Sequence, residues 1–361
     1  MPIPTSTLPH TPHRSAPRPR VGVWLAALCC TGGVWLGGCG TIGGSRTADA
    51  PSRGTPRATT LEQATPQTQA QIQTAQTLLD EGRLDAALAE FGLALEENPN
   101  LVEAHMGMGQ VFRERNQPAI AEEYFANALR LDPNNADAQY YVGLMSQLQG
   151  RINEAITAYL RTLVLDPDDP RASREIASAY VQAGRPDYAL PYALRATRLE
   201  GDNQAAWCNL AATYNLLGDY EKALQSYRTA TELGTLDDPV LLGLADTHLK
   251  LGNYQRAANT LESVIRTNPT ATAHERLGYA RFKRREFDNA LNHYRTAVEM
   301  NPREVAALNG VGAVLVTYYM QGDGRDRDQL EDALAAWRTS LRIRPSQPRI
   351  VNLLARYQRP G

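Results

Sequence analysis

The sequence predicts an all-α solenoid made of eight copies of one helix pair. The stretch 136–169 shows the unit, in which small and apolar residues recur at helical spacing, Gly150 ends a first helix and Pro167 ends a second. An alanine in the second helix recurs at 34-residue intervals at Ala87, Ala121, Ala155, Ala189, Ala223 and Ala257, then at Ala290 and Ala333. Such a period indicates stacked helix pairs that share one continuous core.

Two further positions of the unit keep their size. One is always small: Ala75, Gly109, Gly143, Ala177, Ala211, Ala245, Gly278 and Gly312. The other is usually bulky: Phe91, Phe125, Tyr159, Ala193, Tyr227, Leu261, Tyr294 and Trp337. Small residues let two helix backbones approach closely, and a bulky residue fills the space beside them. We therefore expect these two positions to pack against each other.

These registers resemble the tetratricopeptide repeat over about residues 68–347. The resemblance implies a right-handed superhelix with repeats at 68–101, 102–135, 136–169, 170–203, 204–237, 238–270, 271–304 and 305–347. Residues 348–361 are expected to close the array as a capping helix, since they carry one apolar helical face. That face consists of Ile350, Leu353, Leu354 and Tyr357.

The N-terminal residues 1–38 have the pattern of an export signal. A basic start without acidic residues precedes an uncharged run over 21–38. The run ends in the sequence Leu-Gly-Gly-Cys at 36–39, which resembles the lipobox of bacterial lipoproteins. The resemblance implies that Cys39 receives lipid and becomes the first residue of the mature chain. An uncleaved membrane helix or an ordinary signal peptide is the alternative, although five glycines weaken a helix here.

A lipid on Cys39 implies a protein anchored in the cell envelope. Gly40 follows the cysteine instead of the aspartate that often retains lipoproteins in the inner membrane, which favours the periplasmic side of an outer membrane if the cell has one. Residues 39–67 are rich in Gly, Ser, Thr, Pro and Ala and predict a flexible tether. A random coil of this length spans about 30 Å on average.

Two copies depart from the pattern. In 170–203, Pro191 falls inside the second helix and predicts a kink, either in an otherwise ordinary repeat or in a bent segment that serves a partner. In the last copy the alanine spacing lengthens to 43 residues, so about nine extra residues are expected within 318–332. Their acidic residues do not follow the order of a calcium loop. We expect a solvated loop with a helix N-cap there.

The resemblance also implies a concave groove lined by the first helix of each repeat. The groove residues expected to bind a partner are Met106, Arg113, Tyr140, Leu144, Arg171, Arg174, Asn209, Asn215, Tyr279, Phe282 and Lys283. This mixture of apolar, aromatic and polar groups suits a peptide or a partner helix. Some family members grip a C-terminal carboxylate with a clamp of Lys and Asn residues. Arg174 and Asn209 are the nearest matches here, and that clamp is incomplete.

Composition and motifs argue against several functions. The net charge is −2, with 37 basic and 39 acidic residues, which suggests neither nucleic acid nor a highly acidic substrate. The six histidines lack metal-ligand spacing, and no phosphate-binding loop or nucleophile motif occurs. Cys208 is expected to be a small buried or half-buried residue. We therefore expect no enzymatic activity, cofactor, metal or small-molecule substrate.

The leading functional hypothesis is a lipid-anchored scaffold that binds other envelope proteins through its groove. A narrower version is a factor that helps to assemble an envelope machine. The alternatives are a self-associating structural lipoprotein and an accessory subunit that supports an enzyme.

Overall fold

The computed structural model describes residues 63–322 and 326–358, which form seventeen α-helices without a β-strand. The helices are α1 (Pro66–Asp80), α2 (Leu84–Glu97), α3 (Val102–Glu114), α4 (Pro118–Leu131), α5 (Ala136–Leu148), α6 (Ile152–Leu165), α7 (Pro170–Gln182), α8 (Pro186–Leu199), α9 (Gln204–Leu217), α10 (Tyr220–Leu233), α11 (Asp238–Lys250), α12 (Tyr254–Thr267), α13 (Ala271–Lys283), α14 (Phe287–Met300), α15 (Val305–Gln321), α16 (Arg327–Ile343) and α17 (Pro348–Gln358). The predicted signal at 1–38, Cys39 and residues 40–62 of the predicted tether lie outside the described residues.

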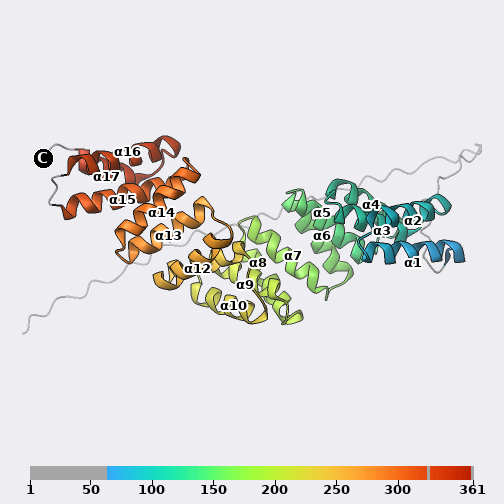
Figure 1. Ribbon diagram of the computed structural model, residues 1–361. Coiled ribbons are helices and arrows are strands. Elements are labelled where there is room, and N and C mark those ends of the chain that lie inside the picture. The colour runs from blue at the N-terminus through green and yellow to red at the C-terminus, as the bar shows by residue number, and fades with distance from the viewer. Residues whose placement is uncertain (1–62, 323–325, 359–361) are drawn as a thin grey trace, which may run out of the picture. The chain divides into compact units, whose positions relative to one another are not determined.

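The helices form the expected solenoid of eight pairs with a capping helix (Figure 1). Each helix packs against the next one along the chain. The odd-numbered helices from α1 to α15 are the first helices of the eight pairs. Most of the first helices begin at a polar side chain that accepts a hydrogen bond from the backbone N–H three residues on. These N-cap residues are Thr65, Asn135, Asp169, Asn203, Asp237 and Thr270.

In repeats one to seven, the turn between the two helices contains a residue in the left-handed backbone conformation. Glycine supplies it in five repeats, at Gly82, Gly150, Gly184, Gly218 and Gly252, with φ between 67° and 82°. Glycine has no Cβ and therefore adopts this conformation at little cost. Asn116 and Arg285 take the same place in repeats two and seven, with φ of 56° and 65°. The fold therefore keeps the turn even where a side chain makes it less favourable.

The small and bulky positions pack together as predicted. A Cβ placed on Gly143 would stand 2.8 Å from the ring of Tyr159, and one placed on Gly109 would stand 2.6 Å from the ring of Phe125. The bulky side chains are buried, with Tyr159 at 0% exposure and Trp337 at 1%. The predicted register therefore describes real contacts between the two helices of a pair.

The same rings also contact the following repeat, which the sequence did not predict. Gly107 lies against Phe91, and Gly243 lies against Tyr227. At the same position of repeat three, Tyr141 stacks on a phenylalanine of repeat two with ring centroids 4.7 Å apart. Phe91, Phe125, Tyr227 and Tyr294 therefore each join two repeats. Hydrophobic clusters accordingly extend from one repeat into the next.

Repeat four contains proline inside its second helix without a break. Helix α8 runs unbroken from Pro186 to Leu199 and includes Pro191. Proline cannot donate the usual hydrogen bond to the carbonyl four residues earlier, which belongs to Asp187. Both residues are exposed, so water can bind that carbonyl. Ala193, which replaces the usual bulky residue, is fully buried beside partly buried aromatic side chains of α8 and α9.

In repeat eight the extra residues lengthen the helices, so the loop expected within 318–332 is wrong in extent. Helices α15 and α16 each have 17 residues, against 13 and 14 in repeat three. No proline or glycine occurs between Gly312 and Gly322, so α15 continues past the usual turn. The expected N-cap is confirmed, since Asp326 accepts a hydrogen bond from the backbone N–H of Gln329 at 3.1 Å.

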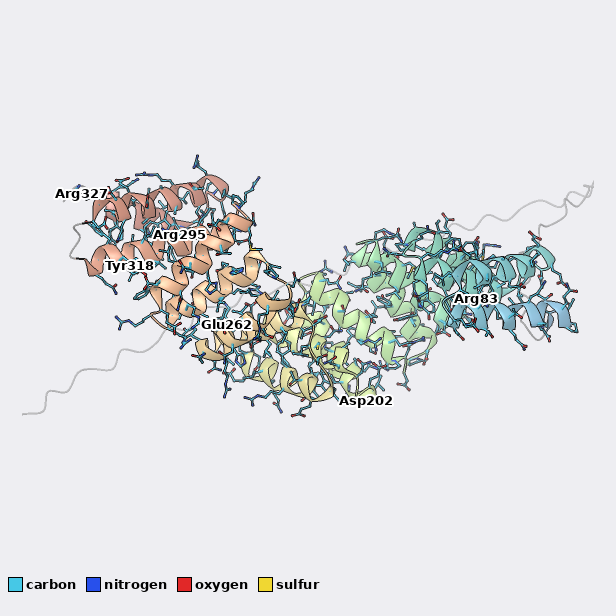
Figure 2. The ribbon with its side chains drawn as sticks, in the orientation of Figure 1. Arg83, Asp202, Glu262, Arg295, Tyr318 and Arg327 are labelled. Carbon is cyan, nitrogen blue, oxygen red and sulfur yellow. The ribbon has the colours of Figure 1, made fainter. Side chains whose placement is uncertain are left out.

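The longer α15, on which Figure 2 labels Tyr318, contacts the preceding repeat. Tyr318, which lies on the added part of α15, donates a hydrogen bond from its hydroxyl to Asp288 at 2.6 Å. Burial and this carboxylate raise the pKa of Tyr318 to about 12. Its ring meets that of Phe287 edge to face, with centroids 6.2 Å apart. The extra turn of helix therefore stabilises the junction between repeats seven and eight.

Helix α17 closes the array as predicted. Its apolar face packs against the core of repeat eight through Ile350, Leu353, Leu354 and Tyr357. Gln347, just before α17, accepts a hydrogen bond from the Asn309 amide at 2.8 Å and donates one to the Ser340 carbonyl at 3.2 Å. Among the described residues, no helix combines the length and the apolar character needed to cross a membrane.

Candidate functional site

The first helices form one layer, whose exposed face is the candidate binding groove. First helices of neighbouring repeats contact each other at α1/α3, α5/α7, α7/α9, α9/α11, α11/α13 and α13/α15. Side chains at corresponding positions of successive first helices therefore line a shared surface. The residues predicted to bind a partner lie on these helices, from Met106 on α3 to Lys283 on α13.

Near the N-terminal end of the groove, most predicted residues take part in core packing. Tyr140 is only 6% exposed, and Met106 and Leu144 are partly buried against hydrophobic clusters. Arg113 is bonded to Glu114 at 2.5 Å, and its guanidinium lies 5.4 Å from the centre of a tyrosine ring on α5. This part of the groove therefore offers few free polar groups to a partner.

The guanidinium of Arg171 is bound by carboxylates of its own chain. It donates hydrogen bonds to Asp137 at 2.6 Å and to Asp169 at 2.7 Å, and it lies 4.8 Å from the centre of the Tyr140 ring. The hydrogen bond with Asp169 is the main cause of the raised pKa of Arg171. A partner that carries an anion would have to compete with these two carboxylates.

The arginine and asparagine of the incomplete clamp do not form an anion site. Arg174 donates to Glu200 at 2.6 Å and to Glu175 at 3.3 Å, and its side chain is 16% exposed. The Asn209 amide donates to the backbone carbonyl of Arg174 at 3.1 Å. The Arg174 side chain is thus held within repeat four, whereas Asn209 connects repeats four and five. Sequence reasoning missed Glu175 and Glu200 as the partners of Arg174.

Asn215 connects helices of two repeats. Its side-chain oxygen accepts a hydrogen bond from Thr247 at 2.8 Å, and its amide donates to the Gly243 carbonyl at 3.1 Å and to the Tyr227 hydroxyl at 3.4 Å. These partners lie on α10 and α11, whereas Asn215 lies on α9. The side chain therefore stabilises the stacking of repeats five and six.

Replacement of Asn215 by alanine should lower the free energy of unfolding by about 1–3 kcal/mol, because it removes three partly buried hydrogen bonds to α10 and α11. Urea unfolding followed by circular dichroism measures the change. Asn259→Ala, on the exposed face of α12, is the control and should change stability by about 0.5 kcal/mol or less. Equal effects of the two substitutions would contradict the proposed role of Asn215.

A pocket of about 280 Å³ opens in the groove between α11 and α13. It is lined by Asp246, Leu249, Lys250, Glu275, Arg276 and Tyr279. Asp246 and Arg276 form an ion pair at 2.9 Å. Burial raises the pKa of Glu275 to about 7, since Arg276 only partly offsets the loss of water around the carboxylate. Sequence reasoning placed Tyr279 in the groove but missed Arg276, which lies one position away from the residues that line the groove in the family.

Aromatic side chains lie beside this pocket, named the α11–α13 pocket. Tyr279 is 37% exposed, and the ammonium of Lys283 lies 5.4 Å from the centre of its ring. Phe282 meets Phe287 edge to face at 5.6 Å and is partly buried against the core of the last repeats. Of the predicted groove residues, Tyr279 and Lys283 are thus the most accessible to a partner.

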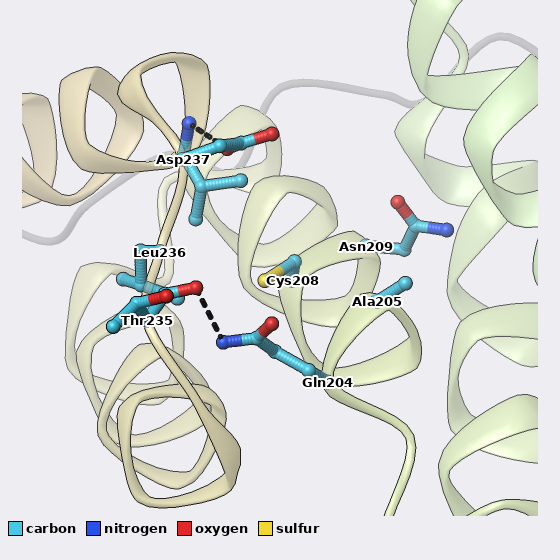
Figure 3. Close-up of a pocket in the computed structure, with 8 residues that line it drawn as sticks. Gln204, Ala205, Cys208, Asn209, Thr235, Leu236 and Asp237 are labelled. Atoms are coloured by element: carbon cyan, nitrogen blue, oxygen red, sulfur yellow. Dashed lines mark hydrogen bonds between the residues drawn. The ribbon is translucent and has the colours of Figure 1, made fainter.

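A second pocket of about 310 Å³ lies between α9 and the start of α11 (Figure 3). Gln204 spans it by donating to the backbone carbonyl of Thr235 at 3.0 Å, and Asp237 caps α11 beside it. Burial raises the pKa of the Cys208 thiol to about 11. A thiol with so high a pKa is a poor nucleophile at neutral pH, which agrees with its expected role as a small, half-buried residue.

Comparison with protein families identifies the helix pairs. One model described as tetratricopeptide repeat matches residues 106–170, 242–302 and 275–317, and two more with the same description match 205–233 and 68–92. The chain is built of tetratricopeptide repeats. Such repeats are typically scaffolds that bind other proteins or peptides and are not enzymes. No curated protein matches the sequence of this chain.

Solved structures share the fold at low sequence identity. The APC/C hetero-tetramer Cut9–Hcn1 is 19% identical with a TM-score of 0.56, and the match covers 80% of this chain and 55% of that one. The pilF protein of Pseudomonas aeruginosa is 24% identical with a TM-score of 0.51 over 56% of this chain and 92% of that one. A tetratricopeptide repeat protein of Parabacteroides merdae is 17% identical with a TM-score of 0.51 over 70% and 100%.

Proposed function

We propose that this tetratricopeptide repeat protein is a lipid-anchored scaffold of the bacterial cell envelope that binds other proteins through its first-helix groove. The observation that carries the binding part is the α11–α13 pocket, which combines a half-buried carboxylate with an exposed aromatic ring in that groove. Polar and aromatic groups in a concavity are what a peptide or a partner helix requires.

The anchor part of the proposal rests on the sequence. The basic start, the uncharged run and the Leu-Gly-Gly-Cys sequence at 36–39 support lipidation of Cys39. Two or more acyl chains hold a protein stably at a membrane, whereas one chain binds only reversibly. A flexible tether after the cysteine would let the repeats reach partners beyond the lipid headgroups.

The test compares the full-length protein with Cys39→Ser in the native cell. The wild-type protein should fractionate with membranes, begin at an acylated Cys39 by mass spectrometry, and retain a specific envelope protein after gentle detergent extraction. Cys39→Ser should move most of the protein out of the membrane fraction. A mature chain that still begins at Met1 would contradict the anchor, and capture of no specific protein would contradict the scaffold.

A further inference from the structure

The α11–α13 pocket contains a carboxylate whose charge its neighbours do not balance. Among the described residues, Glu275 makes no hydrogen bond or ion pair, and its pKa is raised chiefly by burial. Two more carboxylates, Asp246 and Glu304, act on it electrostatically, against the single guanidinium of Arg276. That guanidinium is already paired with Asp246 at 2.9 Å. The environment of Glu275 is therefore short of positive charge.

Lys250, the other basic residue that lines the pocket, does not supply the missing positive charge. Lys250 is exposed at the C-terminal end of α11, where its ammonium remains hydrated. The face of the Tyr279 ring can bind a cation. The ammonium of Lys283 already lies 5.4 Å from the centre of this ring. An aromatic face attracts a cation by a cation–π interaction. Carboxylates next to it add charge-assisted hydrogen bonds.

We propose that the α11–α13 pocket receives the cationic side chain of a bound peptide segment, with its charge against Glu275 and its aliphatic part against Leu249 and Tyr279. A volume of about 280 Å³ is near the lower limit of small-ligand pockets, which span roughly 300–1,000 Å³, and suits one long side chain. This inference rests on the proposed function, since it names the chemistry by which the groove selects a partner.

Binding of a cation here would be coupled to proton release. A positive charge beside Glu275 favours the ionised carboxylate and moves its pKa from about 7 towards the ordinary value of 4.5. Near pH 7 Glu275 is protonated in a large fraction of the free protein and ionised in the complex. Affinity should therefore rise between pH 6 and pH 8.

The test uses the full-length protein in detergent and two peptides, acetyl-Gly-Gly-Arg-Gly-Gly-amide and the same peptide with citrulline in place of arginine. Citrulline keeps the shape of arginine but has no charge. In calorimetry at pH 8, the arginine peptide should bind about tenfold more tightly than the citrulline peptide, as a charged hydrogen bond provides. At pH 7, buffers of different ionisation enthalpy should reveal proton release.

Glu275→Gln should remove the preference for arginine and the proton release. Glu299→Gln, on the exposed face of α14, is the matched control and should behave as the wild type. Equal binding of the two peptides to the wild-type protein, or no binding of either at millimolar concentration, would overturn the inference. An unchanged preference in Glu275→Gln would overturn it as well.

Failure of the pocket and failure of the scaffold function give different results. If the protein captures an envelope partner and Glu275→Gln retains it fully, the pocket is not the recognition site, while the scaffold function stands. If the arginine peptide binds as expected and no partner is captured, the scaffold function fails and the pocket remains.

Discussion

Replacement of Gly310 by alanine should lower the free energy of unfolding by about 1–3 kcal/mol, as overpacking of a core does. A Cβ at this position would collide with the ring of Tyr294, which is 3% exposed. The ring cannot move away, since a Cβ on Gly278, on its own repeat, would already stand 2.9 Å from it. Alanine normally stabilises a helix by about 1 kcal/mol relative to glycine, so the collision has to exceed that gain.

Gly92→Ala provides the matched control, because Gly92 also lies inside a helix but has no atom within 4 Å of an added Cβ. This substitution should be neutral or stabilise the protein by up to about 1 kcal/mol. Urea unfolding measures both effects, and amide hydrogen exchange should place the loss caused by Gly310→Ala in repeats seven and eight. Equal stability of the two variants would contradict tight packing of the Tyr294 ring between repeats seven and eight.

The contact at Gly310 illustrates what the sequence could and could not predict. The position of Gly278 is small in every repeat and that of Tyr294 is usually bulky, so their mutual packing follows from the period alone. Gly310 occupies a position that carries very different residues in other repeats: Gly107, Tyr141, Glu175, Asn209, Gly243 and Arg276. Such variation gives no signal of a shared contact, although the structure places this position against the bulky residue of the preceding repeat.

The groove shows a similar limit. Tyr140 and Glu275 occupy the same position in repeats three and seven, so the sequence predicts the same exposure for both. In the structure, Arg171 of the next repeat covers Tyr140, whereas Glu275 remains in an open pocket. The helical period identifies the face on which a residue lies. Whether a side chain of the same protein already covers it depends on the neighbouring repeat, which the period does not describe.

Glu275→Gln should stabilise the protein above pH 7 by about 2 kcal/mol, and this gain should disappear below pH 4.5. Burial raises the pKa of Glu275 in the folded state from 4.5 to about 7. The folded state therefore binds a proton more tightly than the unfolded state. Below pH 4.5 the contribution of Glu275 to stability is fully present. This contribution is lost as the pH rises through 7, because the folded state then has to maintain a half-buried negative charge.

Glutamine has the shape of a protonated glutamate and no charge, so the variant keeps the low-pH stability at every pH. Urea unfolding of both proteins at pH 4 and pH 8 gives the difference, with Glu299→Gln as a control that should stay within about 0.5 kcal/mol of the wild type. A gain of the same size at both pH values would show that it does not come from the carboxylate charge. A loss of stability at pH 8 would mean that Glu275 already has a favourable partner within the chain.

A stabilising substitution at this position would also support the role proposed for the pocket. Functional sites often retain groups that lower stability, and a half-buried carboxylate without a hydrogen bond is such a group. The ionised Glu275 lowers the stability of the free folded protein. A bound cation would offset this unfavourable energy, so binding would restore part of that stability. The same carboxylate would then lower the stability of the free scaffold and raise its selectivity for a basic segment.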